Sequence, residues 1–174
     1  MNYFEFYEMP ESFAVDAAAL KKKFYELSKR YHPDFYANES EARQQEILEL
    51  STLNNKAFQV LGDAAKRMEY VLKLHNLLQE GEKYELSPAF LMEMMDINEA
   101  LMDVDDADQL AAITAQINDF ENDLNSELAT HIANYQSDTA AVKEKELKAI
   151  KDIYFRQKYL LRIKDSLNTF AARL

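Results

Sequence analysis

The sequence predicts an all-α fold, and three observations support this prediction. Only two glycines and three prolines occur in 174 residues, which is few for the turns of a β-rich protein. Apolar residues recur at steps of three and four through most of the chain, the spacing of one face of a helix. An Asp or Ser of the type that caps helices precedes each of these stretches.

The first half is expected to begin with a helical hairpin. Asp16 is the expected N-cap of its first helix, which ends because Pro33 disfavours helical geometry at His32. A second helix is expected from near Ser40 to Gly62, whose missing side chain suits a left-handed C-cap. The apolar faces carry Leu20, Phe24, Leu27 and Tyr31 on the first helix, and Ile47, Leu50, Asn54, Phe58 and Leu61 on the second.

A third helix and a boundary follow the hairpin. Asp63 is expected to cap a helix that buries Met68, Val71 and Leu72 and ends near Leu74. The tract from His75 to Glu85 shows no periodicity and contains Gly81, which favours a boundary between domains. The expected layout is a domain over 1–75, a linker over 76–86 and a second domain over 87–174.

The second half is expected to form a bundle of three helices. Ser87 followed by Pro88 is a strong start signal, because a proline at the first helical position gives up an amide that would be unpaired anyway. This helix should reach about Met102. The starts of the other two stay open between neighbouring residues: Asp105 or Asp106 for the middle helix, and Ser137 or Asp138 for the last.

Apolar spacing assigns core faces to these last two helices. Alternating steps of three and four favour nearly antiparallel packing, as in helical bundles. The middle helix carries Leu110, Ile113, Ile117, Phe120, Leu124, Leu128, Ile132 and Tyr135, and the last carries Leu147, Ile150, Tyr154 and Leu161.

Composition excludes several classes of function. A net charge of −11 disfavours nucleic-acid binding, and the absence of cysteine excludes disulfides and thiolate metal sites. No apolar run reaches the length of a membrane span and no signal-peptide pattern opens the chain, so a cytoplasmic protein is expected. No metal or cofactor site is expected, nor an enzyme, because no set of nucleophile, base and oxyanion donor can be assembled.

The turn His32-Pro33-Asp34 follows a helix that is basic on its polar side. One interpretation is an ordinary loop, in which proline stops the helix and aspartate bonds nearby amides. The other is a docking surface, because a basic face that leads into an exposed turn attracts an acidic partner. The basic residues of this face are Lys21, Lys22, Lys23, Lys29 and Arg30.

The helix that starts at Pro88 carries a second apolar stripe beside its expected core stripe. A helix that contacts two neighbours in a bundle would also show so broad an apolar arc. Methionines with an acidic margin equally suit an adaptable protein-binding surface. The stripe consists of Leu91, Met95 and Met102, and it is bordered by Met92, Asp96, Glu99 and Asp103.

The segment from Tyr3 to Leu74 resembles a J domain. The resemblance rests on the basic helix, on the run from Tyr31 to Asp34, and on the stretch Asn54-Asn55-Lys56-Ala57-Phe58-Gln59-Val60-Leu61 with Arg67-Met68-Glu69-Tyr70 after it. With the opening Asn2-Tyr3-Phe4-Glu5, no glycine-phenylalanine linker and an acidic helical second half, the whole chain resembles the HscB co-chaperones of iron–sulfur cluster biogenesis. Without a cysteine module, it resembles the bacterial type.

This resemblance implies two domains in an L-shaped arrangement and a co-chaperone function. The first domain would stimulate the ATPase of a DnaK-class, HscA-like chaperone through His32, Pro33 and Asp34, with Lys22, Lys23, Lys29 and Arg30 as its electrostatic landing face. The second would deliver an IscU-like scaffold protein bound by Leu91, Met92, Met95, Asp96, Glu99, Asp103 and Phe155. Two alternatives stay open: a helical adaptor with a J-like domain unconnected to iron–sulfur biogenesis, and a J protein for a general DnaK chaperone with another client.

Overall fold

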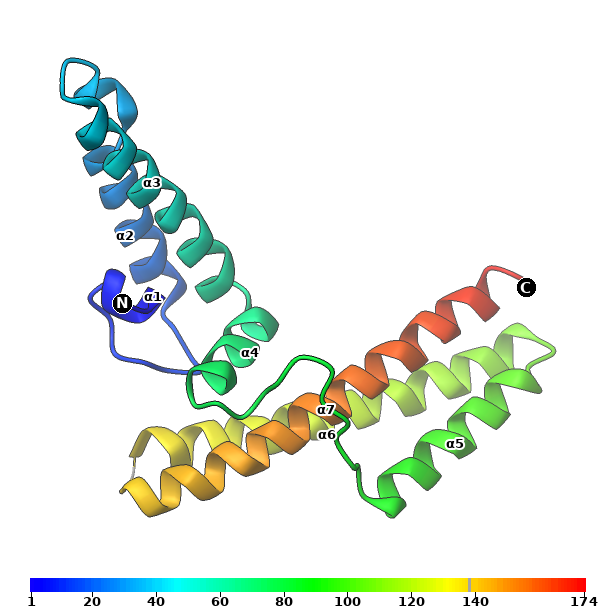
Figure 1. Cartoon of the computed structure of the whole chain (residues 1–174). Helices are drawn as coiled ribbons and strands as arrows, with labels where there is room; N and C mark the ends of the chain where they lie inside the picture. Colours follow the sequence, from blue (N-terminus) through cyan, green and yellow to red (C-terminus); the bar gives the residue numbers. More distant parts are fainter. Residues whose placement is uncertain (138) are drawn as a thin grey trace. The chain divides into compact units, whose positions relative to one another are not determined.

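The computed structural model describes residues 1–137 and 139–174, and every regular element in these ranges is helical, which confirms the all-α class (Figure 1). The chain forms two compact units, Met1–Asn76 and Leu77–Leu174. No helix in the described ranges combines the length and the apolar character needed to cross a bilayer.

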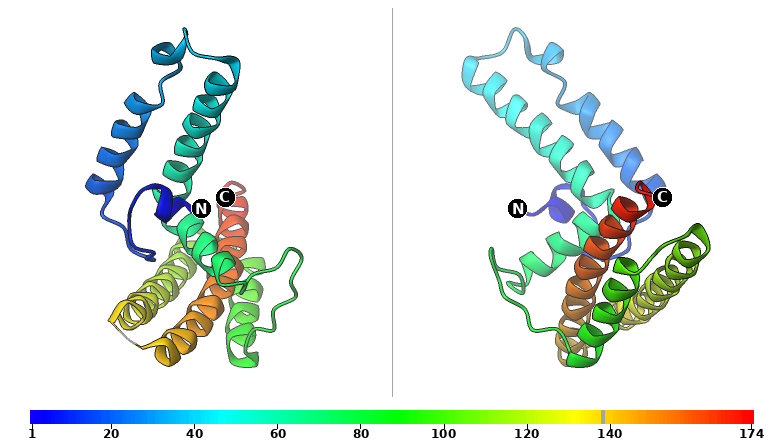
Figure 2. Two further views of the ribbon diagram at one scale, coloured as in Figure 1. Left: turned by 60° about the vertical axis from the view of Figure 1, so that its left-hand side comes forward. Right: turned by 90° about the vertical axis from the view of Figure 1, so that its right-hand side faces the viewer.

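The first unit is built on an antiparallel hairpin of two helices, which lie side by side in both views of Figure 2. Asp16 accepts hydrogen bonds from two amides of the first turn, which confirms the predicted cap, and Ser40 accepts one from Arg43, which confirms the predicted helix start near Ser40. The elements are α1 (Tyr3–Phe6), α2 (Ala17–Arg30), the 3₁₀ turn η1 (Pro33–Tyr36), α3 (Glu41–Leu61) and α4 (Ala64–Leu74).

A buried polar side chain joins the two helices of the hairpin. Asn54 of α3 is 1% exposed, and its side-chain amide donates to the carbonyl of Phe24 and to the hydroxyl of Ser28 on α2. Its side-chain oxygen accepts from the phenol of Tyr7 at 2.7 Å. Asn54 therefore links α2, α3 and the segment after α1 through bonds that have no competition from water.

Replacing Asn54 by alanine is expected to lower the free energy of unfolding of this unit by about 2 kcal/mol, because buried donors and acceptors lose their partners. Hydrogen exchange of the α2 and α3 amides in the full chain measures the loss of protection. Asn55→Ala is the matched control, since the neighbouring side chain is exposed. Equal exchange rates in the two variants would contradict a stabilising role for the Asn54 bonds.

The prediction of a left-handed cap at Gly62 is wrong. Gly62 ends α3 with φ −80° and ψ −12°, right-handed values that any residue can adopt. Glycine is favoured here by a close approach instead, because a Cβ atom at this position would lie 2.7 Å from the carbonyl oxygen of Phe58. The predicted cap of the next helix is confirmed, since Asp63 accepts a hydrogen bond from the amide of Lys66.

The second unit is a bundle of three helices, α5 (Pro88–Met102), α6 (Ala107–Ser137) and α7 (Ala140–Ala171). The Ser87 cap with Pro88 behind it is confirmed. Of the two candidates for the start of α6, Asp106 accepts a hydrogen bond from the amide of Gln109.

The start of α7 differs from the prediction. Ser137 is the last residue of α6, where its hydroxyl donates to the carbonyl of Asn134, so its assignment as the cap of α7 is wrong. The other candidate, Asp138, lies outside the described residues. Thr139 occupies the N-cap position of α7 without a side-chain bond to the first turn.

The core of this unit lies where α5 meets the second half of α7 and the part of α6 from its start to just past its middle. Phe90, Met94, Ile97 and Leu101 of α5 are buried there, against Ile113, Ile117 and Leu124 of α6 and Leu160, Ile163 and Leu167 of α7. The other halves of α6 and α7 pack against each other, with buried Tyr135, Leu147, Ile150 and Ile153.

One residue of the predicted α7 core face is misplaced. Leu161 is 58% exposed, whereas its neighbour Leu160 is buried in one row with Ile153 and Leu167. These three repeat every seven residues, the period of helices that stay in contact over a long distance. Tyr154 is half-buried, whereas Leu147 and Ile150 lie in the core as predicted.

Candidate protein-binding surfaces

The loop between α2 and α3 is fixed by its own side chains. Pro33 begins η1, and Nδ1 of His32 accepts a hydrogen bond of 3.2 Å from the amide of Asp34. The phenol of Tyr36 donates to the carbonyl of Arg30 at the end of α2, at 2.7 Å. These bonds hold the loop in a defined turn, and the carboxylate of Asp34 points outward from it.

This loop presents three chemically different groups to solvent. The side chain of Asp34 is 87% exposed and that of His32 is 52% exposed. Phe35 is 74% exposed, and its ring meets the imidazole edge-on at 5.8 Å. Because Nδ1 of His32 accepts from the backbone, its neutral ring carries the proton on Nε2. The loop thus offers an anion, a hydrogen-bond donor and an exposed aromatic ring.

The basic residues of α2 divide into exposed and paired ones. Lys22 and Lys29 are exposed, while Arg30 forms an ion pair of 2.9 Å with Glu26. The side chain of Lys23 is only 15% exposed, because its ammonium group pairs with Glu8.

The Lys23 pair also affects its partner, since the hydrogen bond from Lys23 lowers the pKa of the Glu8 carboxyl. Lys29 and Arg30 thus stand in the last turn of α2 next to the loop, Lys22 is exposed about two turns earlier, and Lys23 is turned toward the segment after α1.

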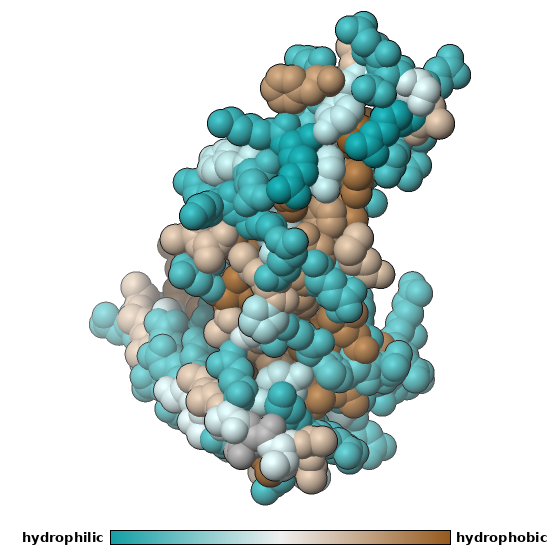
Figure 3. Space-filling model, turned by 90° about the vertical axis from the view of Figure 1, so that its left-hand side faces the viewer, coloured by the Kyte–Doolittle hydropathy of each residue, from teal (hydrophilic) through white to brown (hydrophobic). Residues whose placement is uncertain are grey.

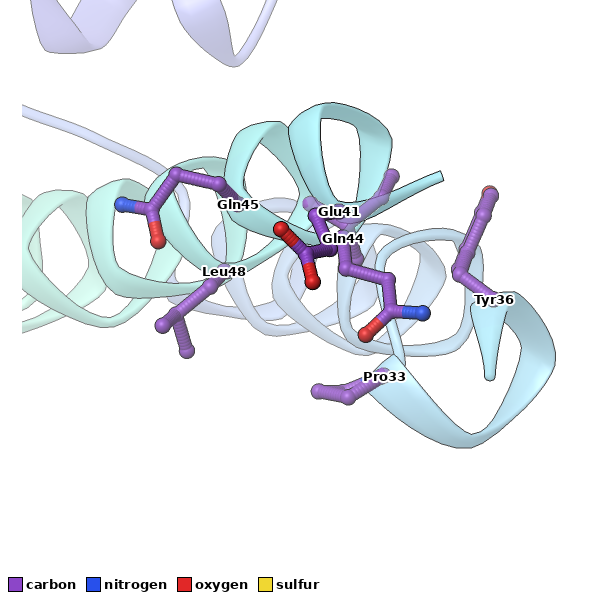
Figure 4. Close-up of a pocket in the computed structure, with 7 residues that line it drawn as sticks. Pro33, Tyr36, Glu41, Gln44, Gln45 and Leu48 are labelled. Carbon is purple, nitrogen blue, oxygen red and sulfur yellow. The ribbon is translucent and has the colours of Figure 1, made fainter. Parts of the chain in front are cut away.

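A shallow depression of about 320 Å³ lies beside the loop, where η1 meets the start of α3. Figure 4 shows Pro33 from the loop along its wall with Gln44, Gln45 and Leu48 from α3. In the space-filling view of Figure 3, the hairpin at the top is covered mainly by hydrophilic residues. Leu48, which is 52% exposed, therefore gives the loop an apolar neighbour on a largely polar surface.

The second apolar stripe of α5 faces solvent. Met95 and Met102 are 57% and 74% exposed, Met92 is 66% exposed, and Leu91 is half-buried. The buried contacts of α5 with α6 and α7 are made by its core stripe, which consists of Phe90, Met94, Ile97 and Leu101. Packing between helices therefore does not account for the second stripe. Its acidic border, formed by Asp96, Glu99 and Asp103, is also exposed.

Phe155 of α7 is placed differently from the residues of α5. Its ring is covered by the ring of Tyr84, with the centroids 4.5 Å apart and the planes at 7°. The phenol of Tyr84 donates to Asp152 at 2.8 Å, and the ammonium group of Lys151 lies 5.5 Å from the Tyr84 ring. Tyr84 therefore shares this part of the surface with Phe155.

Tyr84 was missed in the sequence because it lies in a tract without helical periodicity. Desolvation, followed by the hydrogen bond to Asp152, raises the pKa of Tyr84 to about 12, so its phenol remains a donor at neutral pH. Glu82 adds an ion pair of 3.1 Å with Lys151. In the sequence, the only sign that the expected linker packs on a helix was the aromatic residue Tyr84 among its charged residues.

No metal site is found within the described residues, since no three His, Asp or Glu side chains gather closely enough there to hold an ion. His75 pairs with Glu11 in the first unit, and His131 pairs with Glu146 in the second. The three histidines therefore take part in separate local contacts. What the structure offers is a pair of exposed surfaces suited to proteins.

Comparison with known sequences gives similarity along both units. The profile of the DnaJ domain matches residues 2–70, and that of the HSCB C-terminal oligomerisation domain matches residues 86–168. The Co-chaperone protein HscB homolog of Vibrio cholerae serotype O1 (strain M66-2) is 32% identical over 169 residues, which cover 96% of this chain and 95% of that protein. The homolog of Shewanella baltica (strain OS195) is 30% identical and covers 96% and 99%.

Two solved structures share the fold. The crystal structure of human co-chaperone protein HscB superimposes with a TM-score of 0.74 at 25% sequence identity, covering 100% of this chain and 84% of that one. Chaperone HscB from Vibrio cholerae gives a TM-score of 0.62 at 27% identity, covering 99% of each chain.

Proposed function

The chain belongs to the HscB family of J-domain co-chaperones, and on this premise we propose that it couples an iron–sulfur scaffold protein to a DnaK-class chaperone in the cytoplasm. The chaperone would be HscA-like and the scaffold IscU-like. The chemistry of ATP hydrolysis belongs to the chaperone. The co-chaperone contributes differential contacts that favour the hydrolysing, client-bound state.

The observation that carries the proposal is the exposed carboxylate of Asp34 in a loop that its neighbours fix. A carboxylate held in this way forms a short, charge-assisted bond with an arginine of a partner. Lys22 and Lys29 on the adjoining helix are exposed and attract an acidic partner surface. We assign chaperone binding to His32, Pro33, Asp34, Lys22, Lys29 and Arg30, and we give Lys23 the role of holding Glu8.

We assign scaffold binding to the second unit. The exposed methionines of α5 offer flexible apolar contacts, and the acids beside them select a partner with basic residues. This surface consists of Leu91, Met92, Met95, Asp96, Glu99 and Asp103, with Phe155 and the Tyr84 ring that covers it at one border.

Single-turnover ATP hydrolysis by an HscA-like chaperone tests the proposal. The full chain is expected to accelerate hydrolysis, and adding an IscU-like scaffold is expected to accelerate it further, because both partners bind the same chaperone state. A general DnaK chaperone, assayed in parallel, serves as the comparison. No acceleration of the HscA-like chaperone, with or without the scaffold, would contradict the proposed function.

A further inference from the structure

Arg162 of α7 is an exposed cation in an acidic protein, and it has no carboxylate partner among the described residues. Arg67 donates to backbone carbonyls, and Arg173 lies over the ring of Phe170. Three other arginines of the chain are held by carboxylates. Arg30, Arg43 and Arg156 each form an ion pair with a neighbouring carboxylate. An arginine left unpaired among so many acids retains its full capacity to bind an anion from another molecule.

Aromatic contacts hold the Arg162 side chain in place. Its guanidinium group lies 5.2 Å from the centre of the Tyr159 ring. Tyr159 in turn meets the buried Phe90 of α5 edge-on, with the centroids 5.9 Å apart. The guanidinium group is thus supported by a ring that is itself packed on the core, which lowers the entropy lost when it binds a ligand.

Arg162 lies where α7 meets α5. It lines a depression of about 160 Å³ together with Asn98 of α5 and Ser166 of α7. At 100° per residue, Arg162, Ser166 and Phe155 fall within an arc of about 40° on α7. Arg162 therefore belongs to the same side of the helix as the Phe155 ring that Tyr84 covers.

The depression borders the exposed methionines. Asn98 stands three residues after Met95 and four before Met102, the spacing of neighbours on a helix surface. Glu99 and Asp103 lie on the far side of these methionines from α7. Across this surface, a cation on α7 is followed by an apolar strip and then by a row of acids.

We propose that Arg162 binds a carboxylate of the scaffold protein and thereby sets the orientation in which the scaffold docks. The inference rests on the proposed function and extends it. The acids of α5 select a scaffold with basic residues, and Arg162 adds the requirement for an acidic residue on the same scaffold. A guanidinium group matches a carboxylate with two parallel hydrogen bonds. A partner docked in the reverse orientation would set like charges against each other at both borders.

Binding of the full chain to a purified IscU-like scaffold, measured by calorimetry, tests the inference with a matched pair of variants. Arg162→Gln is expected to weaken binding about tenfold, the effect of losing a hydrogen-bonded charge. Lys158→Gln is expected to change affinity less than about twofold. Lys158 is also exposed on α7 and also lies 5.2 Å from a tyrosine ring, that of Tyr154, but it stands one turn before Arg162, about 40° further from α5, and does not line the depression.

The outcomes separate the two levels of the proposal. Wild-type affinity in Arg162→Gln, or an equal loss in both variants, would overturn the role of Arg162 while leaving scaffold binding in place. An Arg162→Lys variant with intermediate affinity would support a bidentate contact, since lysine keeps the charge without the planar fork. A wild-type chain that does not bind the scaffold would overturn both the proposed function and this inference.

Discussion

Replacing His32 by glutamine is expected to reduce stimulation of the chaperone ATPase more than tenfold. The imidazole caps η1 through Nδ1 while half of its side-chain surface stays exposed, whereas glutamine has more rotatable bonds and no ring fixed at that point. Asp34→Asn, which keeps the shape and removes the charge, is expected to have a similar effect, because the bond to an arginine loses its charge assistance. Single-turnover ATP hydrolysis measures both.

His75→Gln is the matched control for this experiment. His75 lies in the same unit and is exposed, but it pairs with Glu11 rather than with the loop. Its replacement should leave the stimulated rate unchanged. Circular dichroism should show wild-type helix content in all three variants, since none of these side chains is buried. A His32→Gln protein that stimulates like wild type would remove the loop from the mechanism.

Replacing Leu91 and Met95 together by alanine is expected to weaken scaffold binding about 100-fold, at about 1.5 kcal/mol lost for each apolar contact. Stimulation of the chaperone without scaffold should be retained, because the loop lies in the other unit. Calorimetry measures the first effect and single-turnover hydrolysis the second. Stability should change little, since neither side chain is in the buried core.

Leu161→Ala is the control for the double variant. Leu161 is 58% exposed, close to the 57% of Met95, but it stands about 100° around α7 from Arg162, on the side away from α5. We expect wild-type affinity for it. Loss of scaffold binding and of scaffold-free stimulation together in the double variant would contradict separate sites in the two units.

Elements with strong local signals were predictable. The caps Asp16, Ser40, Asp63 and Ser87 each accept the expected amide bond. A cap is a contact between residues two or three apart, so the sequence contains both partners. Where the local signal was ambiguous, as between Ser137 and Asp138, the prediction of the start of α7 was unreliable.

Core faces were less predictable on the longest helix. At 100° per residue, Leu161 falls on an apolar face of α7. Packing against the neighbouring helices buries Ile153, Leu160 and Leu167 instead. Which of several apolar stripes is buried depends on the neighbour, and that neighbour is distant in sequence. For the same reason the stripe of Met95 and Met102 had two interpretations until its exposure was known.

The sequence by itself determined the helical class, most helix starts and the loop at His32-Pro33-Asp34, because these depend on backbone preferences and on partners a few residues away. Only the tertiary structure decided which charges are available to a partner. It pairs Lys23 with Glu8, covers Phe155 with Tyr84 and leaves Arg162 without a described carboxylate beside the exposed methionines. Each of these outcomes depends on side chains brought together by packing, which residue spacing does not encode.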